Sequence, residues 1–273
     1  MKTSSSHTGR TLSLRVRSSI LLAAAKLDKE IFDMKATNTS YKLKDSLYRI
    51  DEILNASNED FEDKNCIPTS GLTYKNGYYV YCTAVFVDIC GSSDMTDKHR
   101  RPVLAKIYRS FISEMVAMFN GFDKCREISI NGDCVWAVFD TTNNADVNKA
   151  FDAACKANSL IDILNYKLGK KGYTTFEANI GMDYGRALMV QAGFKGSGIN
   201  DIIWMGDVVN SACHLCNEDR DLIGMRILLG NEVYKRLCAK YQGFCKLYDR
   251  SKSIFMTDAY NSELNNWLKE NRK

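Results

Sequence analysis

Two aspartates at predicted strand ends are the residues best placed to do chemistry in this chain. Asp88 ends the apolar stretch "AVFV" (84–87), and Asp133 directly follows Asn131 and Gly132, a pair that strongly indicates a β-hairpin turn. Either aspartate alone would more often be a turn or capping residue. Two converging carboxylates repel unless a cation lies between them, and Mg²⁺ and Mn²⁺ prefer carboxylate and carbonyl oxygen. The pair therefore predicts a divalent metal site.

A glycine-serine turn after the first aspartate offers a place for phosphate. Gly91, Ser92 and Ser93 lead into a predicted helix. Free backbone N–H groups in such a turn can bind phosphate oxygens. Substrate phosphates also commonly complete the coordination of a protein-bound Mg²⁺. The turn and the aspartate pair together predict a substrate that carries phosphate.

The elements that must position these residues follow from the hydrophobic pattern. Strand chemistry at 78–87 is followed by a helix after Pro102, a hairpin at 127–140, a helix at about 145–167 and a strand at 176–185. This order is that of a split βαβ arrangement in an α+β fold with an antiparallel sheet and flanking helices. If the first strand lies beside the hairpin, Asp88 and Asp133 converge.

An N-terminal extension precedes this domain. Apolar residues recur at helical spacing over 11–35 and again over 42–55, which predicts two amphipathic helices. The polar, turn-rich segment 55–71 then breaks the periodicity and reads as a linker. We therefore divide the chain into a helical extension with its linker, residues 1–71, and a catalytic domain, residues 72–273. Packing or dimer contact is the expected role of the extension.

Composition excludes several classes of protein. Of the 273 residues, 45% are hydrophobic, which suffices for a globular core. Lysine and arginine exceed aspartate and glutamate by only 37 to 33, so no nucleic-acid partner is expected. No stretch approaches the roughly 18 consecutive apolar residues that cross a bilayer, so no membrane span is expected either.

The cysteines indicate a reducing environment. Ten cysteines at irregular spacing lie mostly among apolar neighbours, which predicts free thiols and a cytoplasmic location. Cys213 and Cys216 alone have CxxC spacing. Without a second such pair or paired histidines, a zinc site is not expected there.

Three stretches, in this order, resemble motifs of the class III nucleotidyl cyclases: "FVDICGSS", "NGDCVWAVF" and "WMGDVVNSACH". The resemblance covers roughly residues 78 to 250. It implies a ferredoxin-like cyclase domain that works as a head-to-tail homodimer with its active sites at the interface. One protomer would supply the two aspartates and the other an asparagine.

The resemblance also implies the reaction. Asp88 and Asp133, helped by the backbone carbonyl of Ile89, would hold two divalent ions, Mn²⁺ or Mg²⁺. The ribose 3′-oxygen of a nucleoside triphosphate would attack the α-phosphorus, and pyrophosphate would leave.

Further roles are implied for the second protomer and for the phosphates. Asn210 would orient the ribose, and the turn 89–93 and Arg226 would bind the β- and γ-phosphates. Most of the family has an arginine four positions after the asparagine, where this chain has His214. Histidine could take over the stabilisation of charge on the α-phosphate if protonated, Arg186 could reach the site instead, or His214 could be structural.

The base-selecting positions of the family depart from both purine patterns. They correspond to Ser129 and Ile203, so a site for adenine or guanine is not expected. The chain is most similar to the pyrimidine cyclases of bacterial Pycsar anti-phage systems. That similarity implies a CTP substrate and cyclic CMP, with UTP and cyclic UMP as the alternative, and a separate effector that senses the product. A degenerate domain that binds nucleotide without turnover is a further alternative.

Overall fold

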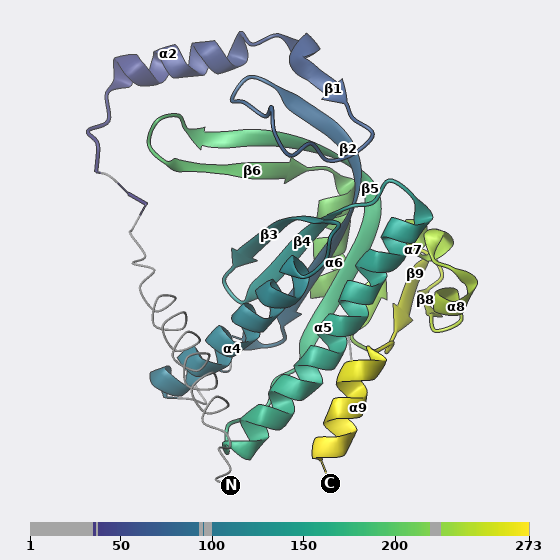
Figure 1. Cartoon of the computed structure of the whole chain (residues 1–273). Coiled ribbons are helices and arrows are strands. Elements are labelled where there is room, and N and C mark those ends of the chain that lie inside the picture. Colours follow the sequence, from purple (N-terminus) through teal and green to yellow (C-terminus); the bar gives the residue numbers. More distant parts are fainter. Residues whose placement is uncertain (1–34, 37, 93–94, 96–99, 219–224, 273) are drawn as a thin grey trace, which may run out of the picture. The chain divides into compact units, whose positions relative to one another are not determined.

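The computed structural model of the chain describes residues 35–36, 38–92, 95, 100–218 and 225–272. The helix predicted over 11–35 lies outside these residues but for its last position. Residues 42–193 and 200–273 form one compact unit, which carries all the elements that position the candidate site. Figure 1 shows its helices and strands.

One mixed sheet runs through this unit, in the order β3-β4-β2-β5-β7-β9-β8, with β1 beside β2 and β6 beside β5. The strands are β1 (Phe61–Asp63), β2 (Gly77–Ile89), β3 (Cys125–Asn131), β4 (Cys134–Asp140), β5 (Ala178–Phe194), β6 (Ile199–Met205), β7 (Ile227–Leu229), β8 (Lys246–Asp249) and β9 (Ile254–Thr257). The helices are α2 (Leu43–Leu54), η1 (Asn58–Asp60), α4 (Arg101–Asn120), α5 (Asn144–Lys170), α6 (Asp207–Asn217), α7 (Asn231–Arg236), α8 (Ala239–Gln242) and α9 (Ser262–Asn271).

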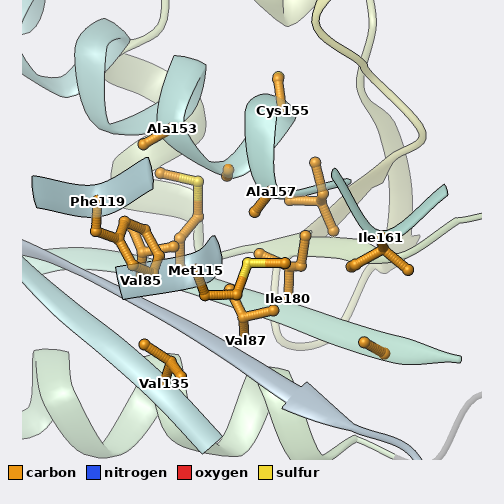
Figure 2. Packing of buried hydrophobic residues seen from close by; sticks show 14 of the residues in the cluster. Val85, Val87, Met115, Phe119, Val135, Ala153, Cys155, Ala157, Ile161 and Ile180 are labelled. Carbon is orange, nitrogen blue, oxygen red and sulfur yellow. The ribbon is translucent and has the colours of Figure 1, made fainter. Parts of the chain in front are cut away.

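The two faces of the central strand β2 are covered by different helices. Val85 and Val87 belong to the larger core, which α4 and α5 cover (Figure 2). Ala84 and Phe86 belong to a second core on the opposite face, which α6 covers. Successive side chains of a strand point to opposite faces, so a strand buried on both sides is apolar at nearly every position. The continuous apolar run before Asp88 has this cause.

Helices α4 and α5 show how the sequence builds the larger core. Helix α4 begins with a proline in its first turn and buries Ile107, Phe111, Met115 and Phe119 at intervals of four residues. Helix α5 is capped by Asn143, whose side chain accepts a hydrogen bond from the backbone N–H of Asp146. Each large apolar side chain buried in this way contributes about 1.5–3 kcal/mol to folding.

The predicted order of elements is confirmed, and the hairpin pairs with the first strand as expected. Strands β3 and β4 pair antiparallel around the predicted turn, and β4 pairs antiparallel with β2. The segment predicted to be a linker differs in part, because Phe61–Asp63 adds a short parallel strand to β2. The cause is local: Gly77 has no side chain, and a Cβ there would lie 2.7 Å from the Phe61 ring.

Two of the expectations drawn from composition can be compared with the described residues. No described helix is long and apolar enough to cross a membrane. All ten cysteines are free thiols. Cys213 and Cys216 both lie in α6, where Cys216 is buried and its Sγ donates to the backbone carbonyl of Asn179. Packing therefore accounts for Cys216.

Candidate functional site

Asp88 and Asp133 lie close enough together for their charges to interact, and Asp88 is on the face of β2 that α6 covers. Val87 of β2 is paired with Val135 of β4, and Asp133 stands in the turn just before β4. Burial and, to a smaller extent, the negative charge of Asp133 together raise the pKa of Asp88 to about 6. The backbone N–H of Ile89 partly opposes this shift. The two carboxylates that the sequence singles out are thus brought together by strand pairing.

This pair suits a hard divalent cation. A cation between the carboxylates would remove the repulsion that raises the pKa of Asp88. The side chain of Ile89 is buried, with 3% exposed, so only its backbone could contribute an oxygen. Among the described residues no three histidine, cysteine or acidic side chains cluster to form a complete ligand set. The remaining coordination positions would fall to substrate and water, as is usual for Mg²⁺.

The turn after Asp88 has a backbone suited to an anion. Gly91 has a φ of 61°, a left-handed conformation that a glycine adopts without strain. Ser92, which follows it, is partly buried, and Ser93 lies outside the described residues. Alternation between ordinary and left-handed backbone points successive N–H groups to one side, as in known anion-binding turns.

Helix α6 is seated against the sheet by two glycines of β5. A Cβ at Gly181 would lie 2.2 Å from the carbonyl oxygen of Ala212, and one at Gly185 would lie 3.2 Å from Val208. The helix therefore approaches β5 more closely than a strand with side chains would allow. Its other surface carries Asn210 and His214, both exposed and four residues apart on one face.

Asn210 and His214 line a cleft of about 510 Å³ between α6, the start of α7 and the turn between β8 and β9. Lys252 from that turn also lines it, and its ammonium lies 4.0 Å from the Glu218 carboxylate. Asp183 lies deeper, where it accepts a 2.5 Å hydrogen bond from Ser211 Oγ. The cleft combines an amide, an imidazole and an ammonium, which are groups that can bind ribose hydroxyls and phosphate.

Lys252 was not among the residues singled out from the sequence. Its only signal is a basic pair, Arg250 and Lys252, in the short segment "DRSKS" between two alternating stretches. A charge in a turn is usually only solvated. What identifies Lys252 is its position in the cleft opposite α6.

Comparisons with known proteins agree with this geometry. Residues 75–255 match the family model described as the adenylate and guanylate cyclase catalytic domain. The chain belongs to this family. It is 39% identical over 261 residues to a protein named uridylate cyclase from Gulbenkiania mobilis, which covers 88% of the chain and 100% of that protein. It is 33% identical to another protein of that name from Treponema porcinum, covering 85% and 78% of the two chains.

Solved structures support the fold. The adenylyl cyclase CyaB from P. aeruginosa superposes with a TM-score of 0.57 at 17% identity, covering 68% of this cyclase and 98% of that chain. The predicted α+β class III cyclase fold is confirmed. At that identity the likeness concerns the fold alone.

The positions expected to select the base lie on two separate strands of the cyclase domain. Ser129 is partly buried on β3, paired with Trp136 of β4, and Ile203 on β6 has 42% of its surface exposed. A cavity of about 470 Å³ is lined by their neighbours Glu127, Ile202 and Trp204 rather than by the two residues themselves. Neither position offers the charge with which the family reads a purine.

The two arginines considered from the sequence lie away from the cleft. Arg226 donates to Asp162 Oδ1 at 2.8 Å and to Asn158 Oδ1 at 3.1 Å, both on α5, and pairs with Glu177. Arg186 is stacked on the Tyr79 ring and paired with Asp63 of β1.

The expected roles of both arginines stay predictions, although both side chains have partners within the chain. The Arg226 guanidinium is paired with the carboxylates of Asp162 and Glu177 and does not line the cleft with Asn210 and His214, and its expected phosphate-binding role stays a prediction. Arg186 follows Gly185 on β5, and Gly185 faces α6. Because successive residues of a strand point to opposite faces, the Arg186 side chain points away from α6 and its cleft.

Proposed function

We propose that this cyclase converts a pyrimidine nucleoside triphosphate, UTP in the first place, to the 3′,5′-cyclic monophosphate and pyrophosphate. The observation that carries the proposal is the convergence of Asp88 and Asp133 beside the turn at Gly91 in a chain of the cyclase family. In the reaction the ribose 3′-oxygen loses its proton and bonds to the α-phosphorus, while the bond from the α-phosphorus to the bridging β-oxygen breaks.

The metal ions would be held by Asp88, Asp133 and the backbone carbonyl of Ile89. When bound, two such ions, Mn²⁺ or Mg²⁺, lower the pKa of the 3′-hydroxyl and neutralise the triphosphate. The protein contributes the orientation of the two carboxylates, which the pairing of β2 with β4 holds in place. The backbone N–H groups of the turn at Gly91 and Ser92 would bind phosphate oxygens.

The rest of the site would come from a second copy of the chain. The cleft with Asn210, His214 and Lys252 is lined by neither Asp88 nor Asp133. Both Asn210 and His214 are exposed, so they are available to a neighbouring molecule. In a head-to-tail homodimer Asn210 would orient the ribose, His214 would stabilise charge on the α-phosphate, and Lys252 would bind the outer phosphates.

The choice of UTP rests on the relatives. From the sequence alone CTP is slightly preferred, yet the two relatives described above are both named uridylate cyclase. Ser129 and Ile203 carry no charge for a purine edge, which supports a pyrimidine but does not separate the two. The resemblance to Pycsar cyclases further supports a role in anti-phage defence, in which a separate effector senses the product.

Incubation of the purified full chain with Mn²⁺ and each of ATP, GTP, CTP and UTP, followed by mass spectrometry, tests the proposal. We expect cyclic UMP from UTP. Cyclic CMP as the only product would overturn the choice of UTP. A cyclic purine nucleotide as the only product would overturn the proposal of a pyrimidine substrate.

A pair of variants tests whether any turnover comes from the metal site. Asp133→Ala should remove it, whereas Asp60→Ala, at an exposed aspartate of η1, should leave it unchanged. Full activity in Asp133→Ala, or no product from the unaltered protein with any of the four nucleotides, would contradict the proposed chemistry.

A further inference from the structure

Helix α2 exposes an apolar seam that the described residues of its own chain leave uncovered. No residue of α2 is buried by the described part of the chain. Leu43, Leu47, Ile50 and Leu54 have 63%, 54%, 47% and 76% of their surface exposed. An isolated helix of 12 residues is marginal in water, so its apolar face needs a partner.

The spacing of the seam suits a second helix rather than a flat surface. The intervals between the four residues are four, three and four, which places them at heptad positions d, a, d and a. Such a repeat is the seam of a two-helix coiled coil, and the exposed Ile53, at position g, borders it on one side. The ion pair between Glu52, on the outer side, and Lys75 joins the helix to the domain and leaves the seam free.

The charges beside the seam are self-complementary in only one orientation. Lys44 and Asp51 both occupy position e. In an antiparallel pair, in which Leu47 faces Ile50 of a second copy, position e faces position e, so Lys44 of each copy lies beside Asp51 of the other. A parallel pair would place position g beside e, and Ser46, at g, offers no charge to Asp51.

We propose that α2 pairs antiparallel with α2 of a second copy and thereby helps to hold the cyclase homodimer together. Two-fold symmetry requires such a self-complementary contact. The inference rests on the proposed function, since the head-to-tail site already brings two copies together. Once two copies are joined at one interface, the second contact forms at a high effective concentration, so a short seam suffices.

Sedimentation of the full chain over a range of concentrations tests the seam. The double variant Leu47→Glu with Ile50→Glu should raise the dimer dissociation constant by at least about 10-fold, because it buries charge at two core layers. Tyr48→Glu is the matched control, since Tyr48 is exposed on the outer side of the helix and should leave the constant unchanged. An unchanged constant in the double variant would overturn the proposal.

A charge exchange tests the orientation. Lys44→Glu should weaken the dimer, and adding Asp51→Lys to it should restore the affinity, because the antiparallel pairs are re-formed with opposite sign. Failure of the second change to restore it would contradict the antiparallel pair. If residues 1–34 of the same chain cover the seam instead, the double seam variant would lower thermal stability at an unchanged dimer constant, which again overturns the proposal.

These measurements need no turnover, so they are separate from the test of function. If the unaltered chain makes no cyclic nucleotide, the proposed function fails whatever the dimer constant shows. If the unaltered chain does make the product, the seam variants should approach full activity at high protein concentration. On dilution they should lose activity at a higher protein concentration than the unaltered chain does.

Discussion

The carboxyl of Asp88 occupies a position where its charge is unfavourable in the protein alone. Burial and the nearby charge of Asp133 both favour its neutral form and raise its pKa to about 6. Structural carboxylates are usually paired with a cation or strongly hydrogen-bonded, which lowers the pKa instead. A perturbed carboxylate beside a second one at a strand end is therefore better explained by a ligand than by folding.

His214 stands where most of the family has an arginine, which leads to a prediction. If its imidazole stabilises the charge that develops on the α-phosphate, His214→Ala should lower kcat about 100-fold with little change in KM, because the interaction strengthens only in the transition state. His214→Arg should retain most of the activity. Steady-state kinetics with the preferred nucleotide measures both. Equal activity in the alanine variant and the unaltered protein would show that His214 is only structural.

Asp183 gives a prediction for the pH dependence of stability. Burial raises the pKa of its carboxyl, although hydrogen bonds from Ser211 and from the backbone N–H of Tyr184 oppose the shift. The folded state thus binds the proton more tightly than the unfolded chain, so this residue's contribution to stability falls as pH rises through the raised pKa. Asp183→Asn should therefore raise the melting temperature by about 2–4 °C at pH 8.

At pH 3, below the ordinary aspartate pKa of about 3.9, the same substitution should have little effect, because the carboxyl is then largely protonated in both the folded and the unfolded protein. Asparagine can still accept from Tyr184 and donate to Ser211 Oγ, so no hydrogen bond need be lost. Thermal unfolding of both proteins at both pH values checks this. A lower melting temperature of the variant at pH 8 would show that the ionised carboxylate stabilises the fold.

A site residue could be found from the sequence only where neighbouring residues in the chain determine its position. Asp88 and Asp133 follow from a strand end and a turn, both of which are written in neighbouring residues. The ion pairs of Arg226 could not be predicted, because its partners Asp162 and Glu177 lie 64 and 49 positions away in the chain. No local pattern distinguishes a phosphate-binding arginine from one held by distant carboxylates.

At the scale of elements, the long periodic segments could be predicted and the short ones could not. Helices α4 and α5 and the β3–β4 hairpin each extend over enough residues to show a period. Strands β7, β8 and β9 have three or four residues each, and β1 has three, so their pattern is indistinguishable from loop. These strands are defined by pairing with distant segments, which a single sequence does not reveal.

The close approach of α6 to β5 leads to a prediction about an element. In Gly181→Ala the new Cβ would lie 2.2 Å from the carbonyl oxygen of Ala212, so α6 must shift. We expect a loss of about 1–3 kcal/mol in the free energy of unfolding. We also expect activity to fall by more than the unfolded fraction of the protein explains, because Asn210 and His214 move with the helix.

The matched control is Gly169→Ala in the last turn of α5, where a Cβ would meet nothing within 4 Å. Since alanine is the better helix former, this variant should be as stable as the unaltered protein or slightly more so. Denaturant unfolding and turnover of both variants make the comparison. If Gly181→Ala matched Gly169→Ala in both, the packing of α6 would not depend on the absence of a side chain at 181.

At the scale of the whole molecule, the two sets of site residues occupy different surfaces of one chain. The carboxylates of Asp88 and Asp133 lie at the β2 end and the β3–β4 turn, while the cleft with Asn210 and Lys252 is bounded by α6, α7 and the β8–β9 turn. Complete sites therefore require two copies if both sets serve one substrate. A symmetric pair would form two such sites.

Mixing two inactive variants tests this division. Asp133→Ala lacks a metal ligand, and Asn210→Ala lacks the ribose contact, so each homodimer has two defective sites. When the two chains exchange, about half of the dimers are mixed, and each mixed dimer contains one intact site and one doubly defective site. Activity should therefore rise from near zero to about a quarter of that of the unaltered protein. A mixture as inactive as its components, with exchange confirmed by mass, would show that each site lies within one chain.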